Sequence, residues 1–455
     1  MVGQWRISIG LSTVVGVLSI GTSIPVDSHW YFFIRGGKTL KISNVEVKDL
    51  VKQYGSPLVA YDESALRQRL HDYATYFQSD EFETSVLYAS KAFSCKAMIR
   101  LIDEYGLYLD VVSGGELYTA KQAGYDCSKI FFHGNNKTQE ELEMAIEYGV
   151  GTIVVDNIQE AKRLDALLEE KGSSIHALLR VNPGIEAHTH EYIVTAHVDS
   201  KFGVAMAQEE LMDETIAFLS QSETIQFDGL HAHIGSQIFD KQAFVEEIKK
   251  LFTFVGQLKA KGLTINTLNL GGGFAAKYVE SDQPIPLNEV CSTILATAQE
   301  CNKEVDGMIK RICIEPGRSI VAEAGYSIYT IGDTKQTPNK NYVFVDGGMA
   351  DNIRPALYGA EYDCFIDGKE DQEANVKTTV AGKCCESGDI LIQSIDLPQG
   401  QRGDLLVMKT TGAYGYSMAS HYNKLLLPAV VFVRDGDSRI VIRRETFEDL
   451  IKLEE

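Results

Sequence analysis

The sequence lacks the excess of basic residues that nucleic-acid binding requires. Its 455 residues include 43 lysines and arginines against 63 aspartates and glutamates, which gives a formal net charge of -20. Because phosphate binding needs a basic face, this balance argues against a nucleic-acid partner. The length allows a large core and predicts two domains.

The sequence also lacks any regular arrangement of cysteines, internal repeats or low-complexity tracts. Its eight cysteines are scattered without a Cys-x-x-Cys pair, and the adjacent Cys384 and Cys385 are poor disulfide partners. No histidine and cysteine spacing is typical of a zinc site, so we expect no metal. Most of these cysteines are predicted to be reduced and buried.

The N-terminus has no charged residue between Arg6 and Asp27. A basic residue ahead of an apolar run is typical of a secretory signal or a membrane anchor. The many serines, threonines and glycines, and the absence of a small-x-small cleavage site, instead favour a disordered extension or a misassigned start. We therefore expect residues 1–28 to lie outside the fold, and the protein to be cytoplasmic with no membrane association.

Apolar runs alternate with helical patterns through the middle of the chain. Residues 159–169, for example, place Ala161, Leu164 and Leu168 on one helical face. Such alternation predicts a parallel sheet, and eight units predict a closed (β/α)8 barrel over residues 56–320, an α/β fold. The eight runs are Val86–Ala89, Leu107–Val112, Ile130–Phe132, Thr152–Val155, Ala177–Val181, Asp228–Ile234, Asn266–Leu270 and Ile312–Ile314.

The residues that follow these runs are rich in polar side chains and glycine. In a parallel barrel the carboxyl ends of the strands converge on one site, so this concentration predicts an active site there. The eight predicted strand ends are Lys91, Ser113–Glu116, His133–Asn135, Asp156–Asn157, Arg180–Asn182, His231–Ser236, Gly271–Gly273 and Glu315–Arg318.

Short alternating runs separated by glycine, aspartate and proline follow residue 324. They predict an all-β domain, a sandwich or barrel, over residues 321–455. A strand pattern from Trp30 to Ile42 and a short helical pattern from Glu46 to Tyr54 precede the barrel. We expect these N-terminal strands, within residues 29–55, to join the β domain.

Lys91 ends the first apolar run, where an amine can be desolvated and react with an aldehyde. Gly271–Gly273 and the Gly235-Ser236 pair suit close approach of backbone amides to a phosphate, although three glycines in a row are also an ordinary turn. Together they favour a phosphorylated aldehyde, pyridoxal 5'-phosphate. Glu315 is the carboxylate that we expect to keep the pyridine nitrogen protonated.

His231 and His233 are two residues apart on a predicted strand and would share one face. One of them could stack on the cofactor ring while the other is a hydrogen-bonded histidine of the barrel. We favour His233 for the stacking role because it lies nearer Gly235 and Ser236.

These motifs resemble the fold-type III pyridoxal-phosphate decarboxylases, and in particular the diaminopimelate decarboxylases. The resemblance runs in order from about residue 30 to the C-terminus. Its motifs are residues 88–92, 110–117, 188–195 followed by 201–203, 229–237, 271–274, 315–318, 346–349, 354–358, 385–389 and 412–417. Two departures, His421 where asparagine is usual and Val430 where an acid is common, touch no expected catalytic role.

The resemblance implies roles for individual residues. Lys91 would carry the cofactor, Cys385 would reprotonate the substrate carbon after carbon dioxide leaves, and Tyr414 would lie near the phosphate. The remaining cofactor-binding residues would be His233, Gly235, Ser236, Gly272, Gly273, Glu315, Pro316, Gly317 and Arg318.

Substrate choice divides this family, and the resemblance implies meso-2,6-diaminopimelate, which would be converted to L-lysine and carbon dioxide. Arg354, with Tyr358, Tyr414 and Arg318, suits the distal carboxylate because a guanidinium binds carboxylates bidentately. Glu386 suits the distal ammonium.

In this family the loop that carries Cys385 and Glu386 reaches the partner's site, so a homodimer with shared active sites is expected. The alternatives are another decarboxylase, such as one for carboxynorspermidine, and a racemase on the same barrel.

Overall fold

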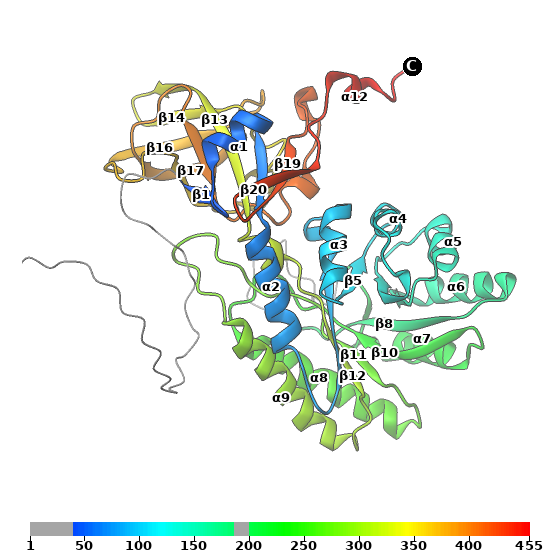
Figure 1. Cartoon of the computed structure of the whole chain (residues 1–455). Coiled ribbons are helices and arrows are strands. Elements are labelled where there is room, and N and C mark those ends of the chain that lie inside the picture. The colour runs from blue at the N-terminus through cyan, green and yellow to red at the C-terminus, as the bar shows by residue number, and fades with distance from the viewer. Residues whose placement is uncertain (1–39, 186–199) are drawn as a thin grey trace, which may run out of the picture. The chain divides into compact units, whose positions relative to one another are not determined.

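A closed ring of eight parallel strands dominates the computed structural model, which describes residues 40–185 and 200–455 (Figure 1). Each strand pairs with the next along the chain, and the last pairs with the first. The ring confirms the predicted barrel, and each of its strands overlaps one of the eight predicted apolar runs. Its strands are β4 (Glu83–Ala89), β5 (Tyr108–Val111), β6 (Ile130–Phe132), β7 (Thr152–Val155), β8 (Ile175–Asn182), β10 (Ile225–His231), β11 (Thr267–Asn269) and β12 (Arg311–Ile314).

Helices separate successive barrel strands, as the alternation predicted. They are α3 (Lys96–Glu104), α4 (Gly114–Ala123), α5 (Gln139–Tyr148), α6 (Ile158–Lys171), α7 (Glu209–Gln221), α8 (Lys241–Ala260) and α9 (Leu287–Glu304). Helix α2 (Glu63–Tyr76) precedes the first barrel strand, and the short α10 (Arg318–Val321) follows the last. None of the helices in the described ranges combines the length and the apolar character needed to cross a bilayer.

Several polar residues at the strand ends serve as helix caps. Ser113 accepts a hydrogen bond from the Glu116 amide at the start of α4, and Asn157 accepts one from the Glu160 amide at the start of α6. Such caps satisfy amides that a helix leaves without partners. Some of the polar residues at this end of the barrel therefore cap helices and do not belong to the site.

Apolar side chains fill the centre of the barrel. Leu87, Phe131, Val154, Leu178 and Cys313, from five strands, form one buried cluster separate from the larger core. Alternate residues of a strand point to opposite faces, so these side chains exclude water from the interior. Polar groups are left for the carboxyl ends of the strands.

A second sheet of nine strands, of which all but β3 follow the barrel in sequence, confirms the predicted β domain. Its strands are β3 (Leu58–Asp62), β13 (Gly325–Gln336), β14 (Asn341–Val345), β15 (Cys364–Ile366), β16 (Val376–Ala381), β17 (Ile390–Leu397), β18 (Leu405–Met408), β19 (Ala429–Arg434) and β20 (Asp437–Ile442). The sequence did not predict β15 or β17. Short helices α11 (Arg354–Tyr358) and α12 (Phe447–Ile451) belong to the same stretch of chain.

The N-terminal boundary of the barrel differs from the prediction. We placed residues from 56 onward in the barrel, but β3 pairs with β13 and β19 and so lies in the second sheet. An apolar run of four residues does not reveal which sheet it joins, because pairing depends on contacts far along the chain.

The segment ahead of β3 contains a small hairpin and a helix. The hairpin strands β1 (Lys41–Ile42) and β2 (Val45–Glu46) pair only with each other among the described residues, and α1 (Val47–Tyr54) follows. Ile42, Val47 and Leu50 pack in one cluster with residues of the second sheet. They therefore join the β domain through packing. The strand predicted from Trp30 lies mostly outside the described residues, as does the 1–28 extension.

Candidate active site

A cavity of about 720 Å³ opens at the carboxyl ends of the barrel strands. It collects most of the residues that the sequence singled out, from both the barrel and the β domain. Those that line it are Lys91, His233, Ser236, Gly272, Gly273, Glu315, Gly317, Arg318, Arg354, Tyr358 and Tyr414. A cavity of this size can hold a cofactor together with a small substrate.

Lys91 lies just beyond β4, in a single 3₁₀ turn over Ser90–Ala92, and its side chain is reached from the cavity. We predicted a partly desolvated amine, but Lys91 is exposed to the open cavity. Burial still acts to lower its pKa. Asp110, Tyr414 and Glu315 act in the opposite direction, and the net result is a pKa above the ordinary value. Without an aldehyde bound, the amine is therefore an ammonium held by nearby acids.

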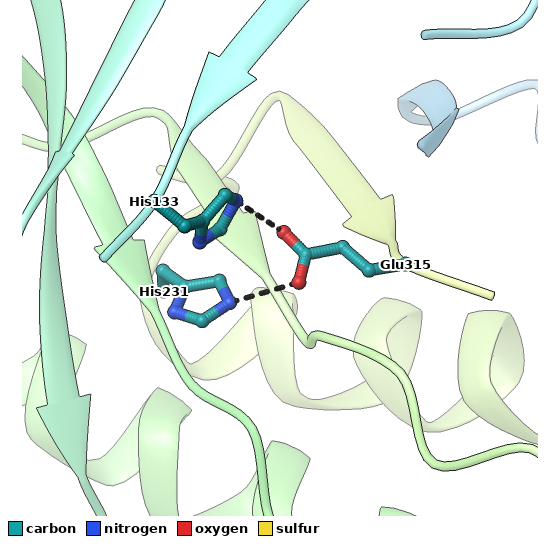
Figure 2. Close-up of side chains that lie close together, drawn as sticks. All are labelled: His133, His231 and Glu315. Atoms are coloured by element: carbon teal, nitrogen blue, oxygen red, sulfur yellow. Dashed lines mark hydrogen bonds and ion pairs between the residues drawn. The ribbon is translucent and has the colours of Figure 1, made fainter. Parts of the chain in front are cut away.

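Glu315 follows β12 and is surrounded by polar partners inside the barrel. Figure 2 shows two histidines that point at its carboxylate, His231 from β10 and His133 from just beyond β6. His231 Nε2 lies 3.1 Å from Oε2, and His133 Nε2 lies 2.9 Å from Oε1. Asn269 donates a hydrogen bond of 2.7 Å to Oε1. Each carboxylate oxygen thus faces at least one polar hydrogen.

These contacts keep a buried acid charged. Burial alone would raise the pKa of Glu315, but the adjacent His133 and His231 hold it well below the usual range. Burial lowers the pKa of His231 to about 4, so this ring is neutral near neutral pH. The ligand atoms of these three side chains lie within 4.8 Å of one another, a spacing that a metal ion could also bridge. As arranged, they present an anion that can hold a proton on a heterocyclic nitrogen.

His233 lines the same cavity, but it does not lie on the predicted strand. Strand β10 ends at His231, so the two histidines do not share one strand, and His233 lies in the following loop. Its Nδ1 accepts a hydrogen bond of 3.0 Å from the Gly272 amide, which leaves the hydrogen on Nε2. Burial, followed by Lys91, holds the pKa of His233 well below its usual value. His233 is therefore a neutral, fixed ring.

The glycine turn after β11 has no room for larger residues. A Cβ on Gly272 would lie 2.4 Å from the Glu315 carbonyl oxygen, and one on Gly273 would lie 2.6 Å from Ile238 Cδ1. Gly273 also has a φ of +109°, which side chains disfavour. Ser236 lines the cavity beside this turn. The Gly271 and Gly272 amides already donate to Asn269 Oδ1 and His233 Nδ1, so within the described residues the Gly273 amide and the Ser236 hydroxyl are what this turn offers to a phosphate.

Gly235 and Pro316 do not line the cavity but belong to its frame. Gly235 has a φ of +152°, a backbone conformation that favours glycine. The Pro316 carbonyl accepts a hydrogen bond of 3.1 Å from Ala89 at the end of β4. A Cβ on Gly317 would lie 2.9 Å from that of Ala89, so glycine permits this close approach to the strand that carries Lys91.

Two buried arginines face the cavity from opposite parts of the chain. Arg318 begins α10, Arg354 begins α11, and their exposed fractions are 6% and 7%. Arg318 donates to Ser236 Oγ through Nε and Nη2, at 3.2 and 2.9 Å. The Tyr414 ring lies 4.8 Å from the Arg318 guanidinium, and Tyr414 has a positive φ of 59°. Neither arginine has an ion-pair partner among the described residues.

Cys385 and Glu386 do not line this cavity in the single chain. They lie on the loop between β16 and β17, and both are exposed. The Cys385 amide donates to Asn423 Oδ1 at 2.7 Å, and the Tyr422 hydroxyl donates to Glu386 at 3.4 Å. The fold therefore presents these two side chains on a surface, away from Lys91.

Several residues of the site had no role in the sequence prediction. His133 and Arg180 stand at predicted strand ends, Asp110 lies in a motif of the resemblance and Asn269 in a predicted run, but none of them was assigned an individual role. Tyr278 and Tyr362 belong to loops, and no motif that we identified includes them. Only the folded structure shows that they contact the two arginines.

The arrangement fits a phosphorylated aldehyde cofactor. Lys91 supplies an amine, Glu315 a buried anion, and the glycine turn with Ser236 a cradle for phosphate. Arg318 is a buried cation beside that cradle. These four features lie around one cavity, and the chain's own groups meet the chemical needs of pyridoxal 5'-phosphate.

Comparison with known proteins agrees with this chemistry. Residues 63–322 match the family model described as pyridoxal-dependent decarboxylase, pyridoxal binding domain. The chain is 48% identical to the diaminopimelate decarboxylase of Bacillus subtilis over 417 residues, 91% of this chain and 95% of that protein.

Two solved structures, each in complex with L-lysine, have the same fold. Diaminopimelate decarboxylase from M. jannaschii has a TM-score of 0.84 at 33% identity and covers 90% of this chain and 94% of its own. That from Helicobacter pylori has a TM-score of 0.82 at 31% identity and covers 90% and 98%. By sequence identity and by fold, the chain therefore belongs to the diaminopimelate decarboxylase family of pyridoxal-dependent decarboxylases.

Proposed function

We propose that this chain removes one carboxyl group from meso-2,6-diaminopimelate and releases L-lysine and carbon dioxide, the last step of lysine biosynthesis. The observation that carries the proposal is the second cationic group in the cavity. Arg354 is buried there without a carboxylate partner among the described residues. A buried unpaired charge is costly, so the site is built for an anionic group of the ligand.

The residues around Lys91 would hold the cofactor. Lys91 is the attachment point, and Gly235, Ser236, Gly272 and Gly273 surround the phosphate. Glu315 holds a proton on the ring nitrogen, and Gly317 lets its turn approach β4. When bound, pyridoxal phosphate supplies the electron sink for the electron pair left as carbon dioxide departs.

The remaining residues act on the substrate. Arg354, Tyr358 and Arg318 bind the distal carboxylate, and Tyr414 closes the site beside Arg318. His233, neutral and fixed by the Gly272 amide, packs against the cofactor ring.

We further propose that the active unit is a homodimer. Cys385, which reprotonates the substrate carbon, and Glu386, which binds the distal ammonium, then come from the second copy. Their exposure on one loop supports this assignment, because both side chains are free to enter a neighbouring site. The eight free thiols suit the reducing cytoplasm, where we place the protein.

A substrate panel tests the reaction. Carbon dioxide release would be measured from meso-diaminopimelate, L-lysine, L-ornithine and carboxynorspermidine with the enzyme supplied with pyridoxal phosphate. We expect release from meso-diaminopimelate far above the others. Release from carboxynorspermidine alone, or exchange of the Cα hydrogen without gas, would replace this proposal with one of its rivals.

The attachment point has its own test. Borohydride reduction should fix the cofactor's mass on the peptide that contains Lys91, and Lys91→Ala should show neither the added mass nor activity.

A further inference from the structure

Tyr278 contacts both cavity arginines. It belongs to the loop that follows Gly271–Gly273, and 7% of its surface is exposed. The Arg318 guanidinium lies 5.7 Å from the centre of its ring, and the Arg354 guanidinium lies 4.8 Å from it. Two cations thus approach one aromatic ring, an arrangement that cation–π attraction stabilises.

The backbone of this loop is fixed. The amides of Tyr278 and Val279 both donate to Asp282 Oδ2, at 2.9 and 3.1 Å. The Lys277 carbonyl accepts a hydrogen bond of 3.1 Å from the Thr410 hydroxyl. Hydrogen bonds to the backbone of residues 277–279 therefore fix the loop that carries the Tyr278 ring.

Tyr362 completes a cluster of four side chains, Arg318, Tyr278, Arg354 and Tyr362, which we name the Arg–Tyr cluster. Tyr362 is 3% exposed and accepts a hydrogen bond of 2.5 Å from Arg354 Nη1. The rings of Tyr278 and Tyr362 meet edge to face, with centroids 5.4 Å apart and planes at 80°. Tyr362 lies behind Arg354 and is not part of the cavity lining.

The hydroxyl of Tyr278 is positioned to contact a ligand. Its oxygen accepts a hydrogen bond of 2.7 Å from Arg318 Nη1. Its own hydrogen has no acceptor within residues 40–185 and 200–455, and the residue lines the cavity. A buried hydroxyl hydrogen without an acceptor is costly, so a ligand oxygen there would be favoured.

We propose that Tyr278 and Tyr362 set the preference of this enzyme for ligands with a second carboxylate. Tyr362 is a positioning residue that holds Arg354 in place, and Tyr278 contacts both guanidinium groups and donates its hydroxyl hydrogen to the carboxylate. An arginine held in its binding conformation loses less side-chain entropy when the ligand arrives. This inference rests on the proposed function, because it assigns further residues to the same substrate site.

The test compares two ligands that differ by one carboxylate. L-lysine, the expected product, keeps the distal carboxylate, whereas 1,5-diaminopentane has the same carbon chain and amines without it. Both would be titrated into the enzyme loaded with pyridoxal phosphate, and the change in cofactor absorbance would give each dissociation constant. We expect the wild-type enzyme to bind L-lysine more tightly than the diamine.

Tyr278→Phe should weaken L-lysine binding by about tenfold or more, because it removes a hydrogen bond to a charged group. It should leave diamine binding within about twofold, since the diamine makes no use of that bond. Tyr362→Phe should weaken L-lysine binding in the same direction and raise the KM for meso-diaminopimelate more than it lowers kcat.

Tyr125→Phe is the matched control. Tyr125 is also a buried tyrosine, 4% exposed, and donates a hydrogen bond of 2.6 Å to the Leu107 carbonyl, outside the cavity lining. It should not change the ratio of the two dissociation constants.

Two results would overturn the inference. One is an unchanged ratio of the two dissociation constants in both Tyr278→Phe and Tyr362→Phe, and the other is a wild-type enzyme that binds the two ligands equally. A wild-type enzyme that selects L-lysine but does not decarboxylate meso-diaminopimelate would refute the proposed function while leaving the carboxylate site in place.

Discussion

His231 donates from Nε2 to Oε2 of Glu315 across 3.1 Å, and both side chains are buried in the barrel. Burial keeps this histidine neutral, with a pKa of about 4, and the hydrogen bond helps to keep the glutamate anionic. A neutral donor stabilises the carboxylate without transferring a full positive charge into the barrel. The negative charge of Glu315 thus remains available for a proton on a bound ring.

Glu315→Gln keeps the shape of this side chain and removes its charge. We expect kcat for carbon dioxide release to fall by about 10²- to 10³-fold, the range seen when a preorganised electrostatic partner is removed. The measurement is steady-state kinetics with saturating cofactor. Glu304→Gln, at an exposed position on α9, is the control and should leave kcat unchanged. A Glu315→Gln enzyme with near-normal kcat would remove Glu315 from the mechanism.

Glu116 predicts a pH dependence of stability. Burial raises its pKa from 4.5 to about 7, although the Val112 amide bound to it at 2.8 Å acts the other way. The unfolded chain therefore releases this proton near pH 4.5, whereas the folded protein keeps it until about pH 7. The free energy of unfolding therefore includes a contribution that is fully present below the unfolded pKa of 4.5 and is lost as the pH rises through the folded pKa of about 7.

Glu116→Gln retains the acceptor for Val112 and cannot ionise. Relative to wild type, it should gain stability between about pH 5 and about pH 8, by at most about 3 kcal/mol. Urea unfolding at both pH values measures the difference. A gap between the two proteins that does not change with pH would mean that Glu116 ionises normally in the folded state.

The barrel also contains a buried ion pair outside the cavity lining. Lys137 and Glu160 lie 2.6 Å apart with about 1% of each side chain exposed, and the ammonium also bonds the carbonyls of Gly134 and Val154. Lys137→Met should destabilise the protein by about 3–5 kcal/mol, because it leaves the Glu160 charge buried and unpaired. Urea denaturation gives the free energy of unfolding.

Two further variants sharpen this prediction. Lys137→Met combined with Glu160→Leu should recover part of the loss, since no uncompensated charge remains. Lys162→Met breaks an exposed pair with Glu214, whose side chains are 47% and 59% exposed, and should cost less than about 1 kcal/mol. Equal losses for Lys137→Met and Lys162→Met would contradict the argument from burial.

The barrel was predictable from the sequence because its signal is local. Each strand is an apolar run bounded by polar or glycine residues, and Lys91 and Glu315 stand at predicted strand ends. Burial of such runs in parallel pairs is what their composition favours. The same argument failed for β3, whose four apolar residues could have joined either sheet, and for His233, which follows the strand instead of belonging to it.

The electrostatics of the site depended on contacts between distant residues. The sequence could not show that Asp110 and Glu315 would outweigh the desolvation of Lys91, because their separation follows from barrel closure. Nor could it place Tyr278 in contact with both Arg318 and Arg354, which come from different parts of the chain. Loop residues in irregular backbone have no periodicity from which their neighbours can be read.

The proposed homodimer makes a prediction that separate defects can test. Lys91→Ala removes the cofactor attachment, and Cys385→Ala removes the proton donor, so each variant alone should be inactive. If Cys385 acts in the partner's site, mixed dimers contain one site with both residues intact and one with neither. Random exchange of subunits at equal amounts should therefore restore about a quarter of wild-type activity.

The controls for this experiment come from the same two variants. The control is a double variant, with Lys91→Ala and Cys385→Ala in one chain, mixed with wild type. In its mixed dimers one site lacks Lys91 and the other lacks Cys385, so neither site is active. That mixture should also have about a quarter of wild-type activity, all of it from wild-type dimers. No recovery when the single variants are mixed and exchange freely would place Cys385 and Lys91 in the same subunit's site, or remove Cys385 from the reaction. Recovery would require the exposed loop between β16 and β17 to serve the neighbouring cavity, because only then can one chain supply what the other has lost.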